Sequence, residues 1–286
     1  MDVLIFSKDR AFQLYSTLET LIKHVQGIDT IYVQFHHSHD RFLKGYELLN
    51  QHFQEVIFID EVPNGFNNTL TAIINQEITS TNLFMEVDDN IYFEDVGLIE
   101  LEEKFNNLNA SKLTVNLDIS LFNSKNYIMK EGIVVVDKLN KIDNPIQDLC
   151  LKYPFNVSNT IHRLKDLKLL LSEDIYLNPI DLESKGSSSK IFTSYPYISY
   201  NPTEVCKQIH TNNFGQRYEE VYNIEILNTL ILNHEVLDIE PKTLKSYSTD
   251  MRWFNGEDIG RFPIFPWEVP PIHHKEIIEN RKPLEL

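Results

Sequence analysis

Residues 83–93 read Leu-Phe-Met-Glu-Val-Asp-Asp-Asn-Ile-Tyr-Phe. An apolar run typical of a buried strand leads into a group of carboxylates, and a second apolar run follows them. The acids therefore come where a strand leaves its sheet, which is the edge where open α/β sheets bind ligands. Crowding Glu86, Asp88 and Asp89 is costly unless a cation or water neutralises them, and Mg²⁺ and Mn²⁺ prefer such oxygen ligands. The stretch predicts a metal-and-diphosphate site, with an exposed acidic turn as the alternative.

The residues before this stretch alternate between short apolar runs and amphipathic segments. Strands are predicted at residues 3–6, 30–35, 56–59 and 83–87, with helices in the intervals between them. Strands that alternate with helices across short polar turns indicate a parallel sheet with right-handed crossovers. The predicted fold class is therefore α/β, with a mostly parallel central sheet.

The second half of the chain is less regular. Strands are expected at 113–118 and 133–136, helices at 164–171 and 224–232, and a turn that runs into a helix at 178–183. From Pro241 onward the chain is rich in proline, tryptophan and charge, which is typical of a tail that docks on a domain.

Composition narrows the choice of partners and location. The chain has 286 residues, 42% of them hydrophobic, and a formal net charge of −16. Such a charge argues against a nucleic-acid partner and against unaided docking on an anionic membrane. Cys150 and Cys206 match neither a zinc spacing nor a disulfide framework. We expect no signal peptide and no transmembrane segment, because no basic leader precedes the first strand and no apolar run reaches about 20 residues. A cytoplasmic protein is the default expectation.

Several families with a similar pattern are excluded by missing motifs. The sequence has no G-x-G-x-x-G after its first strand, no G-x-x-x-x-G-K-[ST] and no G-x-S-x-G. A response-regulator-like domain would gather acids at early strand ends, as Asp9 and Asp60 do here, but its chain would be far shorter.

Three segments instead resemble the GT-A glycosyltransferases. Residues 3–10 (VLIFSKDR) resemble their first strand and nucleotide-binding turn, residues 67–75 resemble their third helix, and residues 84–89 (FMEVDD) resemble the strand that carries the DXD motif. This likeness covers roughly the first hundred residues, and the type is similar to family 2. Segments of uncharacterised bacterial proteins of this type are similar to residues 153–156, 160–163, 178–183, 201–205 and 212–215.

The resemblance implies a fold, an activity and a domain plan. The fold is GT-A, the Rossmann-like fold of nucleotide-diphospho-sugar transferases. The activity is transfer of a sugar (hexosyltransferase type, EC 2.4) from a nucleotide-sugar donor to a glycan or lipid-linked acceptor, with Mn²⁺ or Mg²⁺, in surface polysaccharide synthesis. Residues 1–240 would form the catalytic domain, with a nucleotide-binding half (1–100) and an acceptor half (101–240), and residues 241–286 a docking tail. A peripheral position at the inner membrane fits a lipid-linked acceptor, and the oligomeric state stays open.

The resemblance also implies roles for particular residues. The metal would be held by Glu86, Asp88 and Asp89, with either Glu86 and Asp88 or Asp88 and Asp89 in the DXD role. Donor contacts would come from Ser7, Asp9, Arg10, Asp60, Asn68 and Asp88. Arg10 could instead cap a helix or pair with Asp60. One departure from the family is that the second strand ends in histidines, where many relatives have an aspartate that binds the nucleobase of the donor. The identity of the nucleotide therefore stays open.

An inverting transferase needs a general base, usually Asp or Glu. Glu183 and Asp181 are the candidates, because they precede a predicted helix in the acceptor half, and Asp118 is a third. The alternative for the first two is a helix N-terminal carboxylate favoured by the helix dipole. A retaining enzyme would not use this assignment.

Other interpretations concern the histidines, the tail and the class of protein. His36, His37 and His39 crowd one strand end without a second Cys or His cluster nearby, which disfavours zinc. The metal could gain a late ligand from His210, His273 or His274. The tail contains five aromatic residues that could stack on a sugar acceptor, cover the sheet or mediate self-association: Trp253, Phe254, Phe262, Phe265 and Trp267. A nucleotidyltransferase or a non-catalytic sugar- or protein-binding module on the same fold remain alternatives, although residues 7–10 lack the glycines of the former.

Overall fold

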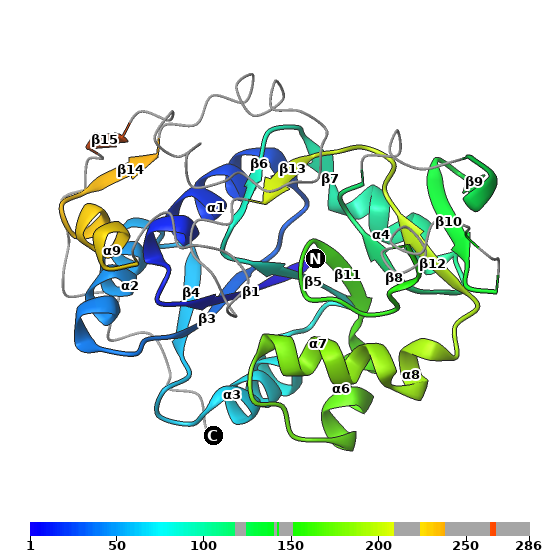
Figure 1. Cartoon of the computed structure of the whole chain (residues 1–286), viewed down its shortest axis with the longest axis horizontal. Helices are drawn as coiled ribbons and strands as arrows, with labels where there is room; N and C mark the ends of the chain where they lie inside the picture. The colour runs from blue at the N-terminus through cyan, green and yellow to red at the C-terminus, as the bar shows by residue number, and fades with distance from the viewer. Residues whose placement is uncertain (118–123, 140–141, 143–150, 209–223, 238–263, 267–286) are drawn as a thin grey trace.

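The computed structural model describes residues 1–117, 124–139, 142, 151–208, 224–237 and 264–266. Among them, nine strands form one large sheet (Figure 1). Its order is β4 (Val56–Asp60), β3 (Ile31–His36), β1 (Asp2–Lys8), β5 (Asn82–Val87), β11 (Thr160–Arg163), β8 (Ala110–Thr114), β12 (Tyr197–Tyr200), β10 (Ile133–Asp137) and β9 (Ile128–Lys130).

The first four strands of this order are parallel, as the sequence predicts. Beyond β5 the sheet is mixed: β11 runs antiparallel to both β5 and β8, while β12 and β8 are parallel. The α/β class is therefore confirmed, and the parallel part is the half that carries the acidic stretch.

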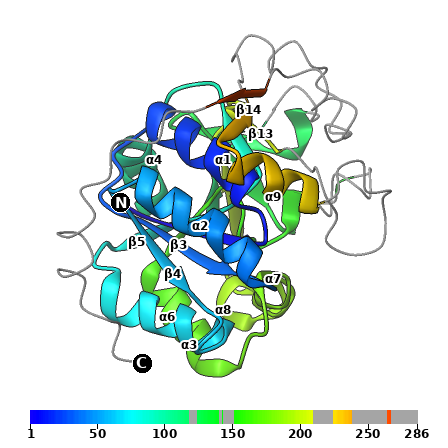
Figure 2. The ribbon, with the colours of Figure 1, turned by 90° about the vertical axis from the view of Figure 1, so that its left-hand side faces the viewer.

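Helices cover both faces of the sheet (Figure 2). One face is covered by α1 (Ala11–His24), α2 (Asp40–His52), α4 (Leu98–Asn106) and α9 (Ile224–Leu232). The other is covered by α3 (Phe66–Ala72), η1 (Ile73–Glu77), α6 (Leu164–Glu173), α7 (Pro179–Ser188) and α8 (Lys190–Thr193). Along β1, Val3 and Ile5 belong to the first core and Leu4 and Phe6 to the second. This two-sided burial explains why the parallel strands read as continuous apolar runs.

Two predicted details of the second half differ from the structure. The strand expected at 113–118 is β8, which ends at Thr114. Beyond it the side chain of Asn116 accepts from Val205 N at 2.8 Å and donates to Cys206 O at 3.1 Å, so this segment bonds to the loop before β13 (Cys206–Gln208). The sequence analysis missed β11, because only four residues form it and two of them are His162 and Arg163.

Three small ladders add to the main sheet. In them β13 pairs with β6 (Asn90–Tyr92), β2 (Val25–Gln26) pairs with β7 (Val96–Gly97), and β14 (Glu235–Leu237) pairs with β15 (Ile264–Pro266). Apart from β15, the proposed tail lies outside the described residues, as do Asp118, His210, His273, His274 and the aromatic residues Trp253, Phe254, Phe262 and Trp267. The division into two halves and a tail stays a prediction.

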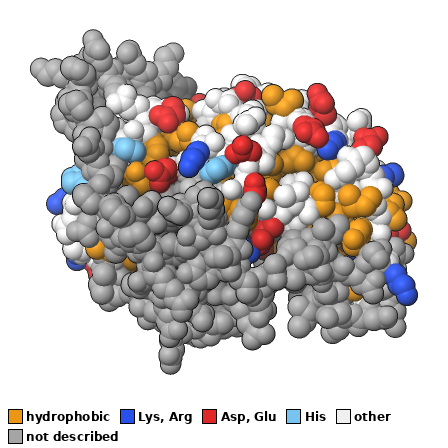
Figure 3. All heavy atoms as spheres, turned by 90° about the horizontal axis from the view of Figure 1, so that it is seen from above, with side chains coloured by type: hydrophobic (Ala, Val, Ile, Leu, Met, Phe, Trp, Pro, Cys, Tyr) orange, Lys and Arg blue, Asp and Glu red, His pale blue; other side chains and the backbone are white. Residues whose placement is uncertain are grey.

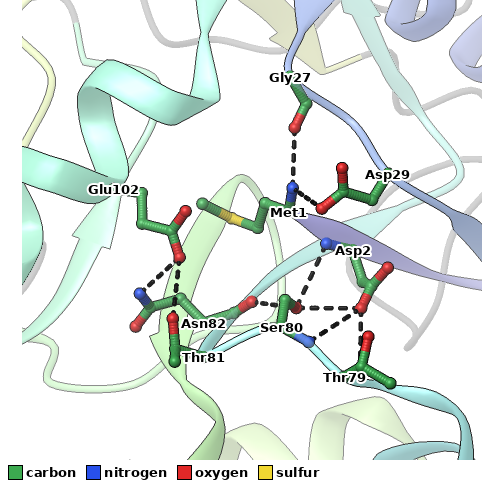
Figure 4. A network of polar contacts seen from close by, with 9 residues as sticks. All are labelled: Met1, Asp2, Gly27, Asp29, Thr79, Ser80, Thr81, Asn82 and Glu102. Carbon is green, nitrogen blue, oxygen red and sulfur yellow. Dashed lines mark hydrogen bonds and ion pairs between the residues drawn. The ribbon is translucent and has the colours of Figure 1, made fainter.

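The amino ends of β1 and β5 are tied together by a polar network (Figure 4). The Asp2 carboxylate accepts from the Ser80 backbone N at 3.3 Å and from Ser80 Oγ at 3.0 Å. Two residues on, the Asn82 amide donates to Glu102 of α4 at 2.8 Å. The carboxyl ends of β1 and β5 lie at the opposite edge, which is where open α/β sheets bind ligands.

None of the helices formed by the described residues has the length and apolar character needed to cross a bilayer. On the face shown in Figure 3, acidic side chains lie scattered among uncharged and hydrophobic ones, and basic side chains lie singly between them.

Candidate functional site

The site lies where β1 and β5 end side by side. Ser7 Oγ donates to Asp88 Oδ2 at 2.7 Å, and one guanidinium nitrogen of Arg10 donates to Asp88 Oδ1 at 3.1 Å and to Asp89 Oδ2 at 3.2 Å. Asp88 and Asp89 are each only 3% exposed. The structure thus brings together four of the predicted site residues, and Arg10 pairs with these two carboxylates.

Tyr46 of α2 supports this arrangement, and the sequence analysis missed it. Its hydroxyl lies 2.8 Å from Ser7 Oγ and accepts the backbone N–H of Arg10 at 3.0 Å. Since the Ser7 proton points to Asp88, the Tyr46 proton points to Ser7. Phe35 of β3 stacks on the Tyr46 ring with centroids 4.3 Å apart. The only sequence signal is the amphipathic pattern of α2, which cannot distinguish Tyr46 from an ordinary core residue.

Burial and like charge dominate the electrostatics of the site. Burial raises the pKa of Asp88, Arg10 opposes that rise, and Asp89 adds to it. Burial also raises the pKa of Tyr46. Asp88 and Asp89 share the guanidinium of Arg10. Paired carboxylate oxygens are ligands that a hard divalent cation prefers.

Asp88 and Asp89 form a pair of carboxylates rather than a closed set of metal ligands. Within the part of the chain that the structure describes, no three His, Cys, Asp or Glu side chains converge in a way that could hold an ion. Mg²⁺ is usually bound through one or two protein carboxylates, with water and substrate phosphates as the other ligands. Asp88 and Asp89 match that kind of donor set.

Glu86 belongs to a different set of contacts. It is fully buried, and its Oε1 accepts from Val87 N at 2.7 Å, from Asn159 N at 3.4 Å and from the Asn90 amide, while Oε2 accepts from the Tyr92 hydroxyl. Burial raises the pKa of Glu86 to about 7, against the effect of these hydrogen bonds. Glu86, which the sequence predicts as a metal ligand, therefore lies in a buried hydrogen-bond network that holds the two ends of the turn carrying Asp88 and Asp89.

Asp9 connects the end of β1 to the loop after β3. Its carboxylate accepts from the Ser38 backbone N at 2.7 Å and from Ser38 Oγ at 2.6 Å. Its φ of +57° lies in the left-handed region, which Asp tolerates better than most residues. Asp9 is thus next to the site, but both of its carboxylate oxygens accept hydrogen bonds from Ser38 in the neighbouring loop.

The ends of β3 and β4 carry two His–carboxylate pairs. His37 Nε2 lies 3.1 Å from Asp60, and His36 Nδ1 lies 3.2 Å from Glu61. The His39 ring instead packs against Phe42. The three histidines therefore do not converge on one point. The predicted donor contact Asn68 is exposed on α3, where its amide donates to the Asn64 carbonyl at 3.0 Å.

The two candidate bases lie in the first turns of α7. Asp181 accepts from Leu177 N at 3.0 Å and pairs with Lys185 at 3.2 Å. Glu183 accepts from Val157 N at 3.3 Å, and burial raises its pKa. Val157 precedes Ser158, whose hydroxyl accepts from the Asn90 amide at 3.0 Å. Glu183 is thus linked to the loop beside the acidic turn, whereas the contacts of Asp181 are local to its helix.

Comparisons with known proteins identify one curated relative. The chain matches no protein-family model. It is 24% identical over 300 residues to the bifunctional glycosyltransferase pgtA of Dictyostelium discoideum, across 87% of this chain and 38% of that protein. The chain therefore spans well under half the length of this relative.

Two solved structures show a distant likeness. TarS of S. aureus is 12% identical over 85% of this chain and 68% of that chain, with a TM-score of 0.48. The mannosyltransferase PcManGT of Pyrobaculum calidifontis, in complex with GDP-Man and Mn²⁺, is 11% identical over 72% of this chain and 55% of that chain, with a TM-score of 0.45. TM-scores below 0.5 do not by themselves establish a shared fold. The similarity of most of this chain to a curated glycosyltransferase confirms the resemblance to glycosyltransferases that its first hundred residues indicate.

Proposed function

We propose that the chain is a GT-A-type glycosyltransferase that moves a sugar from a nucleotide-diphosphate donor to a glycan or lipid-linked acceptor. The observation that carries the proposal is the pair of buried carboxylates, Asp88 and Asp89, at the carboxyl end of β5 beside the end of β1. Similarity to a curated glycosyltransferase supports the same class of reaction. Surface polysaccharide synthesis, which the resemblance implies, and a cytoplasmic location, which the cysteine usage and the lack of a leader-like segment favour, remain part of the proposal.

In this proposal Asp88 and Asp89 hold Mn²⁺ or Mg²⁺, and Glu86 does not. A bound divalent ion neutralises the charge that develops on the diphosphate leaving group. Ser7 fixes the orientation of the Asp88 carboxylate through its hydrogen bond of 2.7 Å. Arg10 places a second positive charge beside both carboxylates, where a donor diphosphate would also be held.

The nucleoside would lie toward β3 and β4, because their carboxyl ends continue the edge formed by β1 and β5. Asp9 fixes the loop at Ser38 on that side, and Asp60 with His37 lies at the adjacent strand end. We assign Asp9 a positioning role and keep Asp60 as a donor contact. Nothing in the contacts of Asn68 supports a donor-binding role.

We assign the general base of an inverting reaction to Glu183. Its half-buried carboxylate has a raised pKa and lies against the loop that contacts Asn90. A base with a pKa nearer neutrality removes the acceptor proton more effectively. Asp181 is occupied by the N-terminus of α7 and by Lys185, which suits the structural role expected of such a residue.

Thermal melting with a panel of nucleoside diphosphates and nucleotide sugars tests this function. UDP-GlcNAc and GDP-mannose belong in the panel, each with and without Mn²⁺. A ligand at 100 times its dissociation constant stabilises the protein by about 2.7 kcal/mol, which gives a measurable shift. We expect stabilisation by one nucleotide class, only with Mn²⁺, and its loss in Asp88→Asn. Glu183→Gln is the matched control, because it should keep donor binding and lose transfer. A flat panel would contradict the proposal.

A further inference from the structure

We propose that Glu86 is a positioning residue that holds the Asp88–Asp89 turn in its cation-binding shape without itself touching the cation. The inference rests on the proposed function, because it concerns the same carboxylate pair. It separates the roles of three acids that the sequence places in one motif.

One oxygen of Glu86 spans the turn. Glu86 Oε1 accepts from the backbone N of Val87 at 2.7 Å and from the side-chain amide of Asn90. Asp88 and Asp89 are the two residues between these donors. A single buried oxygen therefore joins the two ends of the turn, and it fixes where the backbone presents the two aspartates.

The other contacts of Glu86 fasten the turn to neighbouring elements. Oε2 accepts from the hydroxyl of Tyr92 in β6, and that hydroxyl lies 2.9 Å from Asn159 Oδ1. The backbone N of Asn159, just before β11, also points to Glu86 Oε1 at 3.4 Å. Cys206 of β13 donates from Sγ to the same Asn159 oxygen at 3.2 Å. Residues of β5, of β6 and of the segment just before β11 thus contact one carboxyl group, and β13 joins them through Asn159.

The same contacts disfavour Glu86 as a ligand. Turning its carboxylate toward an ion would take the acceptor away from the backbone N–H of Val87 and from the buried amide of Asn90, and such losses are costly. Asp88, by contrast, already faces the strand-end edge through Ser7 and Arg10. Residues that orient metal ligands through hydrogen bonds can influence metal affinity strongly without touching the ion.

A matched pair of substitutions separates positioning from ligation. In Glu86→Gln the amide oxygen can keep the N–H donors of Val87, Asn90 and Asn159. Its NH₂ group can donate to the Tyr92 oxygen, and Tyr92 can then donate to Asn159. The substitution therefore preserves the bridge but removes the negative charge that a ligand needs. Glu86→Ala removes the bridge itself.

Titration of Mn²⁺ alone into the full chain, followed by the electron paramagnetic resonance signal of free Mn²⁺, measures the affinity. Removing a residue that orients a ligand typically lowers metal affinity about 10–100-fold, and we expect this of Glu86→Ala, with Glu86→Gln within about twofold of the wild type. Asp88→Asn should abolish binding. Thermal melting of each variant shows whether affinity changes without loss of a cooperative fold.

Several results would overturn the inference. If Glu86→Gln lost Mn²⁺ as completely as Asp88→Asn, Glu86 would be a ligand. If Glu86→Ala bound Mn²⁺ like the wild type, the bridge would have no influence on the site. Should Glu86→Ala fail to fold, Tyr92→Phe replaces it, since it removes one hydroxyl and should give a smaller loss of affinity in the same direction. If the wild type bound Mn²⁺ neither alone nor in the presence of UDP or GDP, the proposed function and the positioning role would be refuted together.

Discussion

Replacing Arg10 by methionine is expected to destabilise the protein strongly, because it removes a guanidinium that pairs with two buried carboxylates. The guanidinium of Arg10 lies 3.1 Å from Asp88 and 3.2 Å from Asp89, with side-chain exposures of 11%, 4% and 3%. Methionine keeps much of the aliphatic volume and removes the charge and the hydrogen bonds. Breaking a buried ion pair on one side typically costs about 3–5 kcal/mol, and two carboxylates share this arginine, so we place the loss in that range.

The decrease in the free energy of unfolding caused by Arg10→Met should depend on pH. Arg10 lowers the pKa of Asp88, so Arg10→Met raises the pKa of this carboxyl in the folded protein. A folded state with a raised carboxyl pKa binds a proton more readily than the unfolded chain, and it gains stability as the pH falls. The difference between wild type and variant should therefore be larger at pH 8 than at pH 5.

A double-mutant cycle measures the coupling free energy between Arg10 and Asp88. It compares the urea unfolding of the wild type with that of Arg10→Met, Asp88→Asn and the double variant. The double variant should be destabilised less than the sum of the single variants, because Asp88→Asn removes one of the charges that Arg10→Met leaves unpaired. A loss of less than about 1 kcal/mol in Arg10→Met, the size measured for exposed pairs, would refute the view that this cluster is buried and tightly paired.

Two further substitutions test the packing on the α7 face of the sheet. Gly186→Ala places a new Cβ 2.5 Å from a ring atom of the fully buried Phe155. It should therefore lower the free energy of unfolding in urea by about 1–3 kcal/mol. The control Ser184→Ala, on the exposed side of the same helix, should be neutral or slightly stabilising. Burial lowers the pKa of His162 to about 3, and the unfolded chain therefore takes up a proton near pH 6.5 that the folded protein does not bind. As the pH falls from 6.5 toward 3, the free energy of unfolding of the wild type should decrease by about 1.4 kcal/mol per pH unit relative to that of His162→Gln. If the free energies of unfolding of the two proteins changed in parallel with pH, the proposed burial of a neutral His162 would be contradicted.

The sequence predicts the parallel half of the fold well because its signals are local. Each of the parallel strands β1, β3, β4 and β5 is a short, mostly apolar run, and the helices between them have apolar faces. The grouping of Ser7, Arg10, Asp88 and Asp89 follows from the rule that parallel strands end at one edge. The strand β11 was missed because its position between β5 and β8 depends on pairing across distant parts of the chain.

Side-chain direction explains why the roles within the site were harder to predict. Glu86, Asp88 and Asp89 are close in sequence, but spacing alone does not show that Glu86 bonds to Tyr92 and Asn159 while Asp88 bonds to Ser7. Tyr46 is missed for a related reason. A helix pattern places it in the core without showing that its hydroxyl reaches Ser7 and Arg10.

The most direct test of the central claim is release of nucleoside diphosphate from nucleotide sugars, followed by mass spectrometry with Mn²⁺ and with a chelator. We expect one donor class to be turned over by the wild type, Mn²⁺ to be required, and Asp88→Asn to lose the reaction. Turnover that persists in the chelator and in Asp88→Asn would contradict the assignment of Asp88 and Asp89 as the cation site of a glycosyltransferase.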